Sequence, residues 1–168
     1  MPEVWDIYDE NRIKTGRTMI RGNEIKNGDY HLVVHVCIFN SKGELLIQKR
    51  TLNKKSYPGM WDVSVGGSAI LGDSSQTAAE RETLEEIGLK INLQDKRPRI
   101  TLNFKGGFDD VYLIKMNVNI DELVLQEEEV SDVKWASLEE VLTLLKENKF
   151  VDYDENLIKF YFSWIKNI

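Results

Sequence analysis

Residues 66–89, GGSAILGDSSQTAAERETLEEIGL, constrain the fold of this chain more than any other stretch. The stretch begins with paired glycines and carries four glutamates around a single Arg81. Gly88 stands where a helix commonly ends in the left-handed conformation that glycine adopts easily. The start of the same helix has three alternative N-caps: Ser74, Ser75 and Thr77. Thr77 would form a capping box with Glu80. The sequence therefore predicts a helix that begins between 74 and 77 and ends at Gly88.

Three glutamates of this helix, Glu82, Glu85 and Glu86, share one face because they lie at positions i, i+3 and i+4. Like charges at this spacing cost about 0.2–0.5 kcal/mol per pair in an isolated helix. Leu84 and Ile87 are expected to point the other way, toward a core. A solvated acidic face explains the spacing in the simplest way. A site for a hard cation is the alternative, since Mg²⁺ and Mn²⁺ prefer carboxylate oxygens.

The bulk properties exclude several classes of protein. A net charge of −6 and a pI near 5.1 disfavour a nucleic-acid groove, because phosphate backbones need clustered Lys and Arg. The longest apolar run, 32–39, is far too short to span a bilayer. The single cysteine, Cys37, excludes an intramolecular disulfide, and the charged start of the chain lacks the apolar core of a signal peptide. We expect a cytoplasmic protein, a monomer or homodimer, with no nucleic-acid or membrane partner.

The remaining pattern of apolar residues and turns predicts a mixed α and β chain. Strands are predicted over 30–39, 44–50, 61–65, 100–104, 111–116 and 132–136. The turn NSKG at 40–43 should join the first two strands as an antiparallel hairpin. Ser137 and Glu140 form a capping box for a helix that runs to about 148. A final core-facing helix is predicted from five apolar residues at helical spacing: Leu157, Ile158, Tyr161, Phe162 and Ile165.

The spacing within residues 67–89 matches a known motif. It reads as Gly, five residues, an acid, seven residues, Arg-Glu, two residues, Glu-Glu, any residue, Gly and an aliphatic residue. This spacing resembles the sequence motif of the Nudix hydrolase family. The matching positions are Gly67, Asp73, Arg81, Glu82, Thr83, Glu85, Glu86, Gly88 and Leu89. Two positions differ from the family pattern. Asp73 replaces a glutamate and is one methylene shorter, and Thr83 stands at a usually aliphatic position.

The resemblance implies an α+β fold, an α/β/α sandwich in which helices flank a mixed β-sheet. On this basis we expect a Nudix hydrolase domain over residues 30–168, with the Nudix box at 67–89. Residues 1–29 are then an N-terminal extension that packs on the domain.

The resemblance also implies the chemistry. In Nudix enzymes divalent metals neutralise the diphosphate, orient it and acidify the attacking water. The implied cofactor is Mg²⁺ or Mn²⁺, with four implied ligands: Glu82, Glu85, Glu86 and the backbone of Gly67. Glu85, Glu86 and Arg81 are candidate catalytic residues, and Arg81 is expected to pair with Asp73 and the helix glutamates. Many family members carry a late acid, for which we choose Glu128 from the run 127–129, with a plain surface role as the alternative.

Three further residues are candidates for substrate binding. Arg50 and Lys54 flank the loop before the box and could hold phosphates, although solvated loop charges are an even alternative. His31 and His35 share one face of a predicted strand, so either could reach a ligand. Of these two we choose His31 as a substrate-binding candidate, with a core or edge-strand role as the alternative for both.

The segments YHLVVHVCIFNSKGELLIQKR and PGMW resemble one subgroup of the fold, the isopentenyl diphosphate isomerases. Those enzymes place a catalytic Cys after the tryptophan strand, followed by Gly and a metal-binding His. Here Gly66 and Ser68 occupy the Cys and His positions, while His31 matches another metal-binding histidine. Isomerisation needs an acid and a base across the double bond, and glycine provides neither. The architecture is therefore isomerase-like, and the expected chemistry is hydrolytic.

These observations together predict a divalent-metal-dependent Nudix pyrophosphohydrolase. Its expected partner is a small diphosphate substrate, a nucleoside diphosphate derivative that it cleaves within the diphosphate linkage. The alternatives are an isopentenyl diphosphate isomerase-like protein and a Nudix-fold ligand-binding protein without turnover. The missing cysteine disfavours the first alternative, and the complete set of box glutamates disfavours the second.

Overall fold

The computed structural model describes residues 2–167. Its helices and strands follow in this order: β1 (Val4–Tyr8), β2 (Lys14–Ile20), β3 (His31–Phe39), β4 (Leu45–Arg50), β5 (Trp61–Asp62), β6 (Val65–Ser68), α1 (Ser75–Ile87), β7 (Ile100–Phe104), β8 (Gly107–Lys115), the 3₁₀ helix η1 (Ile120–Glu122), β9 (Val130–Ala136), α2 (Leu138–Lys146), α3 (Glu155–Trp164) and the 3₁₀ helix η2 (Ile165–Asn167).

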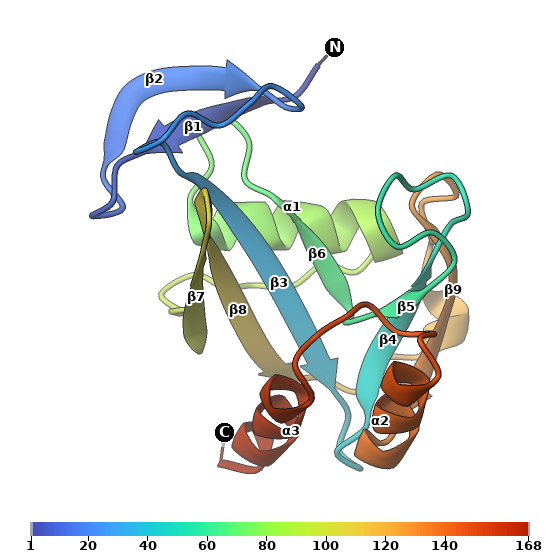
Figure 1. Ribbon diagram of the computed structural model, residues 1–168. Coiled ribbons are helices and arrows are strands. Elements are labelled where there is room, and N and C mark those ends of the chain that lie inside the picture. The colour runs from blue at the N-terminus through green and yellow to red at the C-terminus, as the bar shows by residue number, and fades with distance from the viewer. Residues whose placement is uncertain (1, 168) are drawn as a thin grey trace.

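The strands form a mixed sheet of seven and a separate pair (Figure 1). The order in the large sheet is β5-β4-β3-β8-β7, with β6 paired to β3 and β9 paired to β4. Strands β3 and β8 are parallel, and the other pairs are antiparallel. Strands β1 and β2 form the two-stranded sheet, which lies over α1 and over the loop between β6 and α1, called here the box loop.

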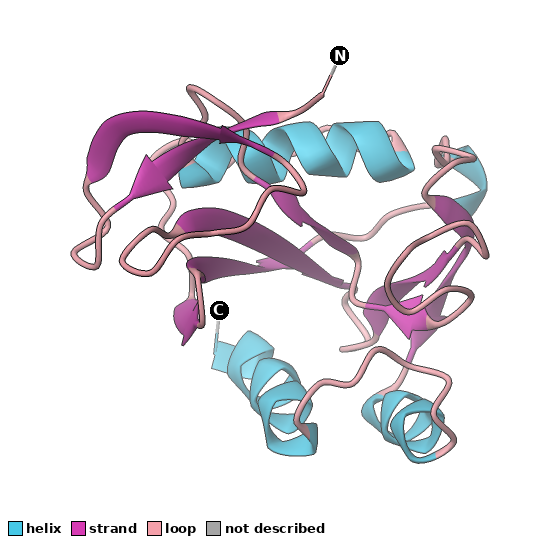
Figure 2. Cartoon of the chain, turned by 45° about the horizontal axis from the view of Figure 1, so that its top comes forward, coloured by secondary structure: helices cyan, strands magenta, loops and turns pink. Residues whose placement is uncertain are grey.

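Helices cover both faces of the large sheet (Figure 2). Alternate residues of β3 point to opposite faces, as a strand requires. Val34 and Val36 belong to the core on the side of α1, and Cys37 and Phe39 belong to the core under α2 and α3. The predicted α+β sandwich with a mixed sheet is confirmed.

The predicted hairpin of the first two sheet strands is correct only at its turn. Strands β3 and β4 pair at Phe39 and Leu45 and then separate, and β6 takes the place beside β3. The side chain of Ser64 joins the two strands where they part: its hydroxyl donates to Leu46 O at 2.5 Å and accepts from Ile38 N at 2.8 Å. The prediction of one strand over 61–65 is therefore wrong, because Ser64 divides it into β5 and β6.

Helix α1 begins after Ser74, whose hydroxyl oxygen accepts from the backbone N–H of Thr77. The hydroxyl oxygen of Thr77 accepts in turn from the backbone N–H of Ser74. Gly88 ends the helix with φ 67°, in the left-handed conformation. The orientation predicted for Leu84 is wrong, since its side chain is 52% exposed. Thr83 faces the core instead, and its hydroxyl donates to Ala79 O one turn earlier, which satisfies the buried polar group.

The last helices agree with the sequence. Ser137 caps α2 by accepting from Glu140 N, and Asp154 caps α3. Four of the five predicted core residues near α3 are buried: Ile158, Tyr161, Phe162 and Ile165. Within residues 2–167, no helix has the length and apolar character that crossing a membrane requires.

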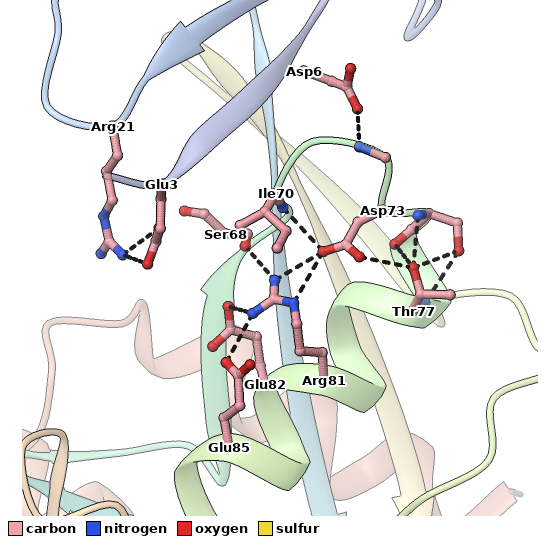
Figure 3. Close-up of polar contacts among 12 residues, drawn as sticks. Glu3, Asp6, Arg21, Ser68, Ile70, Asp73, Thr77, Arg81, Glu82 and Glu85 are labelled. Atoms are coloured by element: carbon pink, nitrogen blue, oxygen red, sulfur yellow. Dashed lines mark hydrogen bonds and ion pairs between the residues drawn. The ribbon is translucent and has the colours of Figure 1, made fainter. Parts of the chain in front are cut away.

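The hairpin of β1 and β2 docks on the loop that leads into α1. Leu71 N donates to Val4 O at 2.7 Å, and Gly72 N donates to the carboxylate of Asp6 at 2.9 Å. The open end of the hairpin carries Glu3 and Arg21, close to the glutamates of α1 (Figure 3). The hairpin therefore adds two charged groups to the region of the box.

Candidate active site

Arg81 is the centre of the polar contacts in the box (Figure 3). Its guanidinium donates to Asp73 at 2.9 Å, to Glu82 at 2.9 Å and to Glu85 at 3.0 Å. A further bond at 3.0 Å reaches the carbonyl of Ser68. Arg81 therefore ties the box loop and β6 to the helix, and Asp73 makes this contact although its side chain is shorter than glutamate.

Gly67 lies directly against the face of α1 that carries Glu82, Glu85 and Glu86, called here the glutamate face. A Cβ atom at this position would stand 2.1 Å from the carboxyl carbon of Glu82. Such a contact is far below the separation of non-bonded carbon atoms, which is about 3.5–4.0 Å. The close approach of backbone and carboxylate therefore requires glycine at this position.

Glu86 is nearly buried at the end of the same face. Gln48 of β4 donates its side-chain amide to Glu86 at 2.8 Å. Burial raises the pKa of Glu86 to about 8, and burial, opposed by Arg81, raises the pKa of Glu82 to about 7. Carboxylates with raised pKa values are only partly compensated by their neighbours, so a divalent cation at this place would stabilise their charged forms.

The glutamate face borders a small cavity of about 90 Å³. The charged side chains that line it are five acids, Glu3, Glu82, Glu85, Glu86 and Glu129, and two cations, Arg21 and Lys54. Each cation is held by a carboxylate, since Arg21 pairs with Glu3 at 2.8 Å and Lys54 pairs with Glu129. The cavity thus combines a cluster of acids with two cations that can change partners.

Larger hollows lie on other faces of the protein. One of 590 Å³ is lined by three arginines, Arg12, Arg97 and Arg99, and by Asp110, which Arg12 binds at 2.7 Å. That hollow has a single acidic residue in its lining, so it offers no cluster of acids for a cation. Because Glu82, Glu85 and Glu86 of the box all line the smaller cavity, we place the candidate active site there.

The donor atoms at this cavity suit a hard divalent cation, because they are carboxylate oxygens and the backbone at Gly67. Among residues 2–167, no three acidic, histidine or cysteine side chains already converge as a ligand set. The reason is visible in Figure 3, where Glu82 and Glu85 turn toward Arg81. Binding of a metal would require these carboxylates to exchange an arginine or amide partner for the cation.

Four candidate catalytic or binding residues selected from the sequence do not line the cavity: Arg81, Arg50, His31 and Glu128. Arg50 donates to the carbonyl of Ser56 and to Asp62, and so fixes the loop that carries Lys54. His31 is buried and stacks on Trp5 with ring centroids 4.3 Å apart. This leaves Lys54 as the substrate-binding candidate that reaches the cavity.

Glu128, the candidate late acid, also lies outside the cavity lining. Its carbonyl accepts from the hydroxyl of Thr51 at 2.9 Å, while the neighbouring Glu129 lines the cavity.

Two residues of the site could not be predicted from local sequence patterns. Gln48 lies on β4 and meets Glu86 only because the sheet packs against α1. Arg21 lies on the N-terminal hairpin, far from the box in sequence, and reaches the cavity through the docking of β1. No local pattern marks either residue, since both depend on contacts between distant segments.

Comparison with known proteins agrees with the fold and the box. The family model described as NUDIX domain matches residues 29–158. An uncharacterized Nudix hydrolase of Listeria monocytogenes is 47% identical over 90% of this chain and 89% of its own length. An isopentenyl-diphosphate Delta-isomerase of Shigella flexneri is 34% identical over 67% of this chain and 64% of its own length.

Among solved structures, the crystal structure of a Deinococcus radiodurans protein superposes with a TM-score of 0.75 at 23% identity. The match covers 94% of this chain and 98% of the other. The family match spans the large sheet, the box helix and the first turn of α3, and the fold neighbour covers nearly the whole chain. The chain therefore belongs to the Nudix family of hydrolases, enzymes that act on phosphoanhydride bonds.

Proposed function

We propose that this protein is a divalent-metal-dependent pyrophosphohydrolase that cleaves the diphosphate linkage of a small nucleoside diphosphate derivative. The observation that carries the proposal is the cavity on α1, where the glutamates of the helix and two exchangeable cations meet. A diphosphate bound with its metal matches this pattern, because the metal suits the acids and the phosphate oxygens suit the cations.

The glutamate face holds the cofactor in this proposal. Mg²⁺ or Mn²⁺, when bound, neutralises phosphate charge and acidifies the attacking water. Glu82, Glu85 and Glu86 would be the carboxylate ligands, and the backbone carbonyl of Gly67 would add an oxygen. Gln48 orients Glu86 by its hydrogen bond, and Arg81 holds the loop before the helix in register with it.

The two cations of the cavity bind the phosphates. Arg21 and Lys54 give up the carboxylates of Glu3 and Glu129 when phosphate oxygens arrive, because charge-assisted bonds to phosphate replace those to carboxylate. The release of Lys54 frees Glu129 beside the glutamate face. Glu129, rather than the adjacent Glu128, is then the late acid that accepts a proton from the attacking water.

A panel of diphosphate compounds tests the proposal. Purified protein is incubated with Mg²⁺ or Mn²⁺ and with ADP-ribose, UDP-glucose, NADH or coenzyme A, and nucleoside monophosphate or its counterpart is measured. We expect hydrolysis of at least one compound, and loss of turnover in Glu85→Gln and Glu86→Gln. Glu139→Gln on α2 is the matched control, an exposed helix glutamate outside the cavity, and should keep full activity.

Two outcomes contradict the proposal. Full activity in both box variants would remove the glutamates from the chemistry. Absence of hydrolysis of every compound with either metal would favour a ligand-binding protein without turnover.

A further inference from the structure

The hollow of 590 Å³ lies at the N-terminal end of α1 and is called here the basic hollow. Its lining comes from the tip of the N-terminal hairpin, the start of α1, the end of α3 and the segment 97–99 that leads into β7. Ser75 lines this hollow, and about 16 Å along the axis of α1 separates it from Glu86, at a rise of about 1.5 Å per residue. The basic hollow is therefore separate from the candidate active site.

The basic hollow carries an excess of positive charge in a protein whose net charge is −6. Its three arginines face one acid, Asp110. Asp110 is buried and accepts from both terminal nitrogens of Arg12, at 3.0 and 2.7 Å, so these two charges neutralise each other. Arg97 and Arg99 make no ion pair with any acid among residues 2–167. The uncompensated charge therefore belongs to Arg97 and Arg99.

The backbone holds these two arginines toward the same hollow. Arg99 donates its N–H to a carbonyl of β8 at 2.7 Å, and the side chain of Gln76 on α1 donates to Lys96 O at 2.8 Å. Pro98 has a restricted φ and favours an extended conformation at Arg97. Side chains two positions apart in an extended segment point to the same side, and both arginines line the hollow.

The indole of Trp164 fixes the plane of one guanidinium. The Cζ atom of Arg99 lies over this ring, 4.1 Å from its centre. The N–H donors of a guanidinium lie in its own plane, so a ring on one face leaves the donors at the edge free. Two such donors match two oxygens of a phosphate group. The indole therefore prepares Arg99 for an anion.

A second hollow, of 560 Å³, adjoins the first, because Arg97 and Arg99 line both. None of the described acidic residues lines the second hollow, and most of its other lining is apolar: Ile91, Leu93, Leu113, Ile114 and Met116. Both volumes lie within the range of small-ligand sites, about 300–1,000 Å³. A ligand with a phosphate on the two arginines and an organic body in the apolar hollow matches the pair of hollows.

We propose that Arg97 and Arg99 form a second ligand site, which binds a small phosphate monoester with its organic body in the apolar hollow. Phosphate between the two arginines removes the repulsion of their like charges. Binding needs no divalent metal, because arginines rather than carboxylates face the phosphate. The proposal goes beyond the proposed function and does not depend on it.

Isothermal titration calorimetry with a chelator tests the site, since the chelator removes metal-bridged binding at the glutamate face. The probes are AMP and hexyl phosphate, which carry the same phosphate monoester on an aromatic and on an alkyl body. Adenosine and inorganic phosphate are the reference compounds. We expect at least one ester to bind more tightly than inorganic phosphate, and adenosine not to bind. The ester that binds more tightly identifies the kind of body.

Removal of either charge should weaken this binding. Arg97→Gln and Arg99→Gln should each raise the Kd of the ester about tenfold or more, the loss of one bond between charged groups. The control Lys90→Gln removes the same charge from an exposed position beyond the other end of α1 and should leave Kd unchanged. The side chain of Arg97 makes no hydrogen bond or ion pair within residues 2–167, so its variant should keep the melting temperature of the wild type.

The indole N–H resonance of Trp164 reports the place of binding. The chain has four tryptophans, and Trp164→Phe assigns the signal. We expect it to shift on titration with the ester, while the signals of Trp5, Trp61 and Trp135 stay in place.

Four outcomes overturn the proposal and leave the proposed function untouched. The first two are absence of binding by both esters, and binding of adenosine as tight as that of AMP. The third is an unchanged Kd in either arginine variant. The fourth is a Trp164 signal that does not move while Arg21→Ala abolishes binding, which would place the ester in the glutamate cavity.

Discussion

Gly67→Ala should disrupt the candidate active site through a single steric contact. The added Cβ would stand 2.1 Å from the carboxyl carbon of Glu82 and 2.4 and 2.5 Å from its two oxygens. Normal separation of non-bonded carbons is about 3.5–4.0 Å, so the carboxylate must move by about 1.4 Å or more. Gly67 is outside the left-handed region, so the substitution adds no backbone strain.

The displacement breaks the bond between Arg81 and Glu82, which is 2.9 Å long and joins side chains that are 23% and 15% exposed. Loss of a bond between charged, largely buried groups costs about 1.5–3 kcal/mol. At about 2–4 °C per kcal/mol for a chain of this size, the melting temperature should fall by roughly 3–12 °C. Affinity for Mn²⁺ should fall at least about tenfold, the effect typical of disturbed metal ligands and their partners.

The assay is a double-mutant cycle with Glu82→Ala, read by thermal unfolding and by Mn²⁺ binding. Removal of the Glu82 carboxylate leaves room for the methyl group, so Gly67→Ala should cost much less stability in that background. Equal costs in the two backgrounds, or a Gly67→Ala protein with the stability and Mn²⁺ affinity of the wild type, would refute the reasoning.

Three further predictions follow from the same geometry. Burial raises the pKa of Glu82 to about 7 and of Glu86 to about 8, so the metal-free folded protein binds protons more tightly than the unfolded chain. Its stability, measured by thermal unfolding, should therefore fall as pH rises from about 4.5 to about 8. Affinity for Mn²⁺, measured by electron paramagnetic resonance, should rise over about pH 6–8 as the carboxylates lose their protons. A stability that rises over this range would contradict the burial of these carboxylates. Arg21→Ala should raise KM for diphosphates about tenfold with little change in Mn²⁺ affinity. The control Arg17→Ala removes a similar exposed ion pair of the same hairpin outside the cavity and should change neither quantity. Equal KM values in the two variants would remove Arg21 from the site. Purified protein should not incorporate deuterium from solvent into isopentenyl or dimethylallyl diphosphate, because β6 carries neither a thiol nor an imidazole, and incorporation of the label would restore the isomerase alternative.

The parts of the site that the sequence predicted are those fixed by local spacing. The helix between Ser74 and Gly88 follows from its caps, and the shared face of its glutamates follows from the helical repeat. The Leu84 error is also local, because Thr83, which stands at a usually aliphatic position of the motif, takes the core-facing side of the helix beside it. Thr83 can do so because its hydroxyl bonds to a carbonyl of its own helix.

The parts that the sequence did not predict depend on contacts between distant segments. Gln48 reaches Glu86 through the packing of the sheet on α1, and Arg21 reaches the cavity through the docking of the hairpin. The place of His35 beside Gly66 follows from a strand register that opens when β3 and β4 part. Ser64 bridges the two strands where they part, and no local pattern marks this role.

Hydrolysis in water labelled with ¹⁸O tests the central claim most directly. The best substrate of the diphosphate panel is incubated with Mg²⁺, and the phosphate products are analysed by mass spectrometry. The account predicts one ¹⁸O atom in one phosphate product, formed at a rate that vanishes with a chelator and in Glu86→Gln. Products without the label, or labelled products whose formation persists with the chelator and in Glu86→Gln, would contradict it.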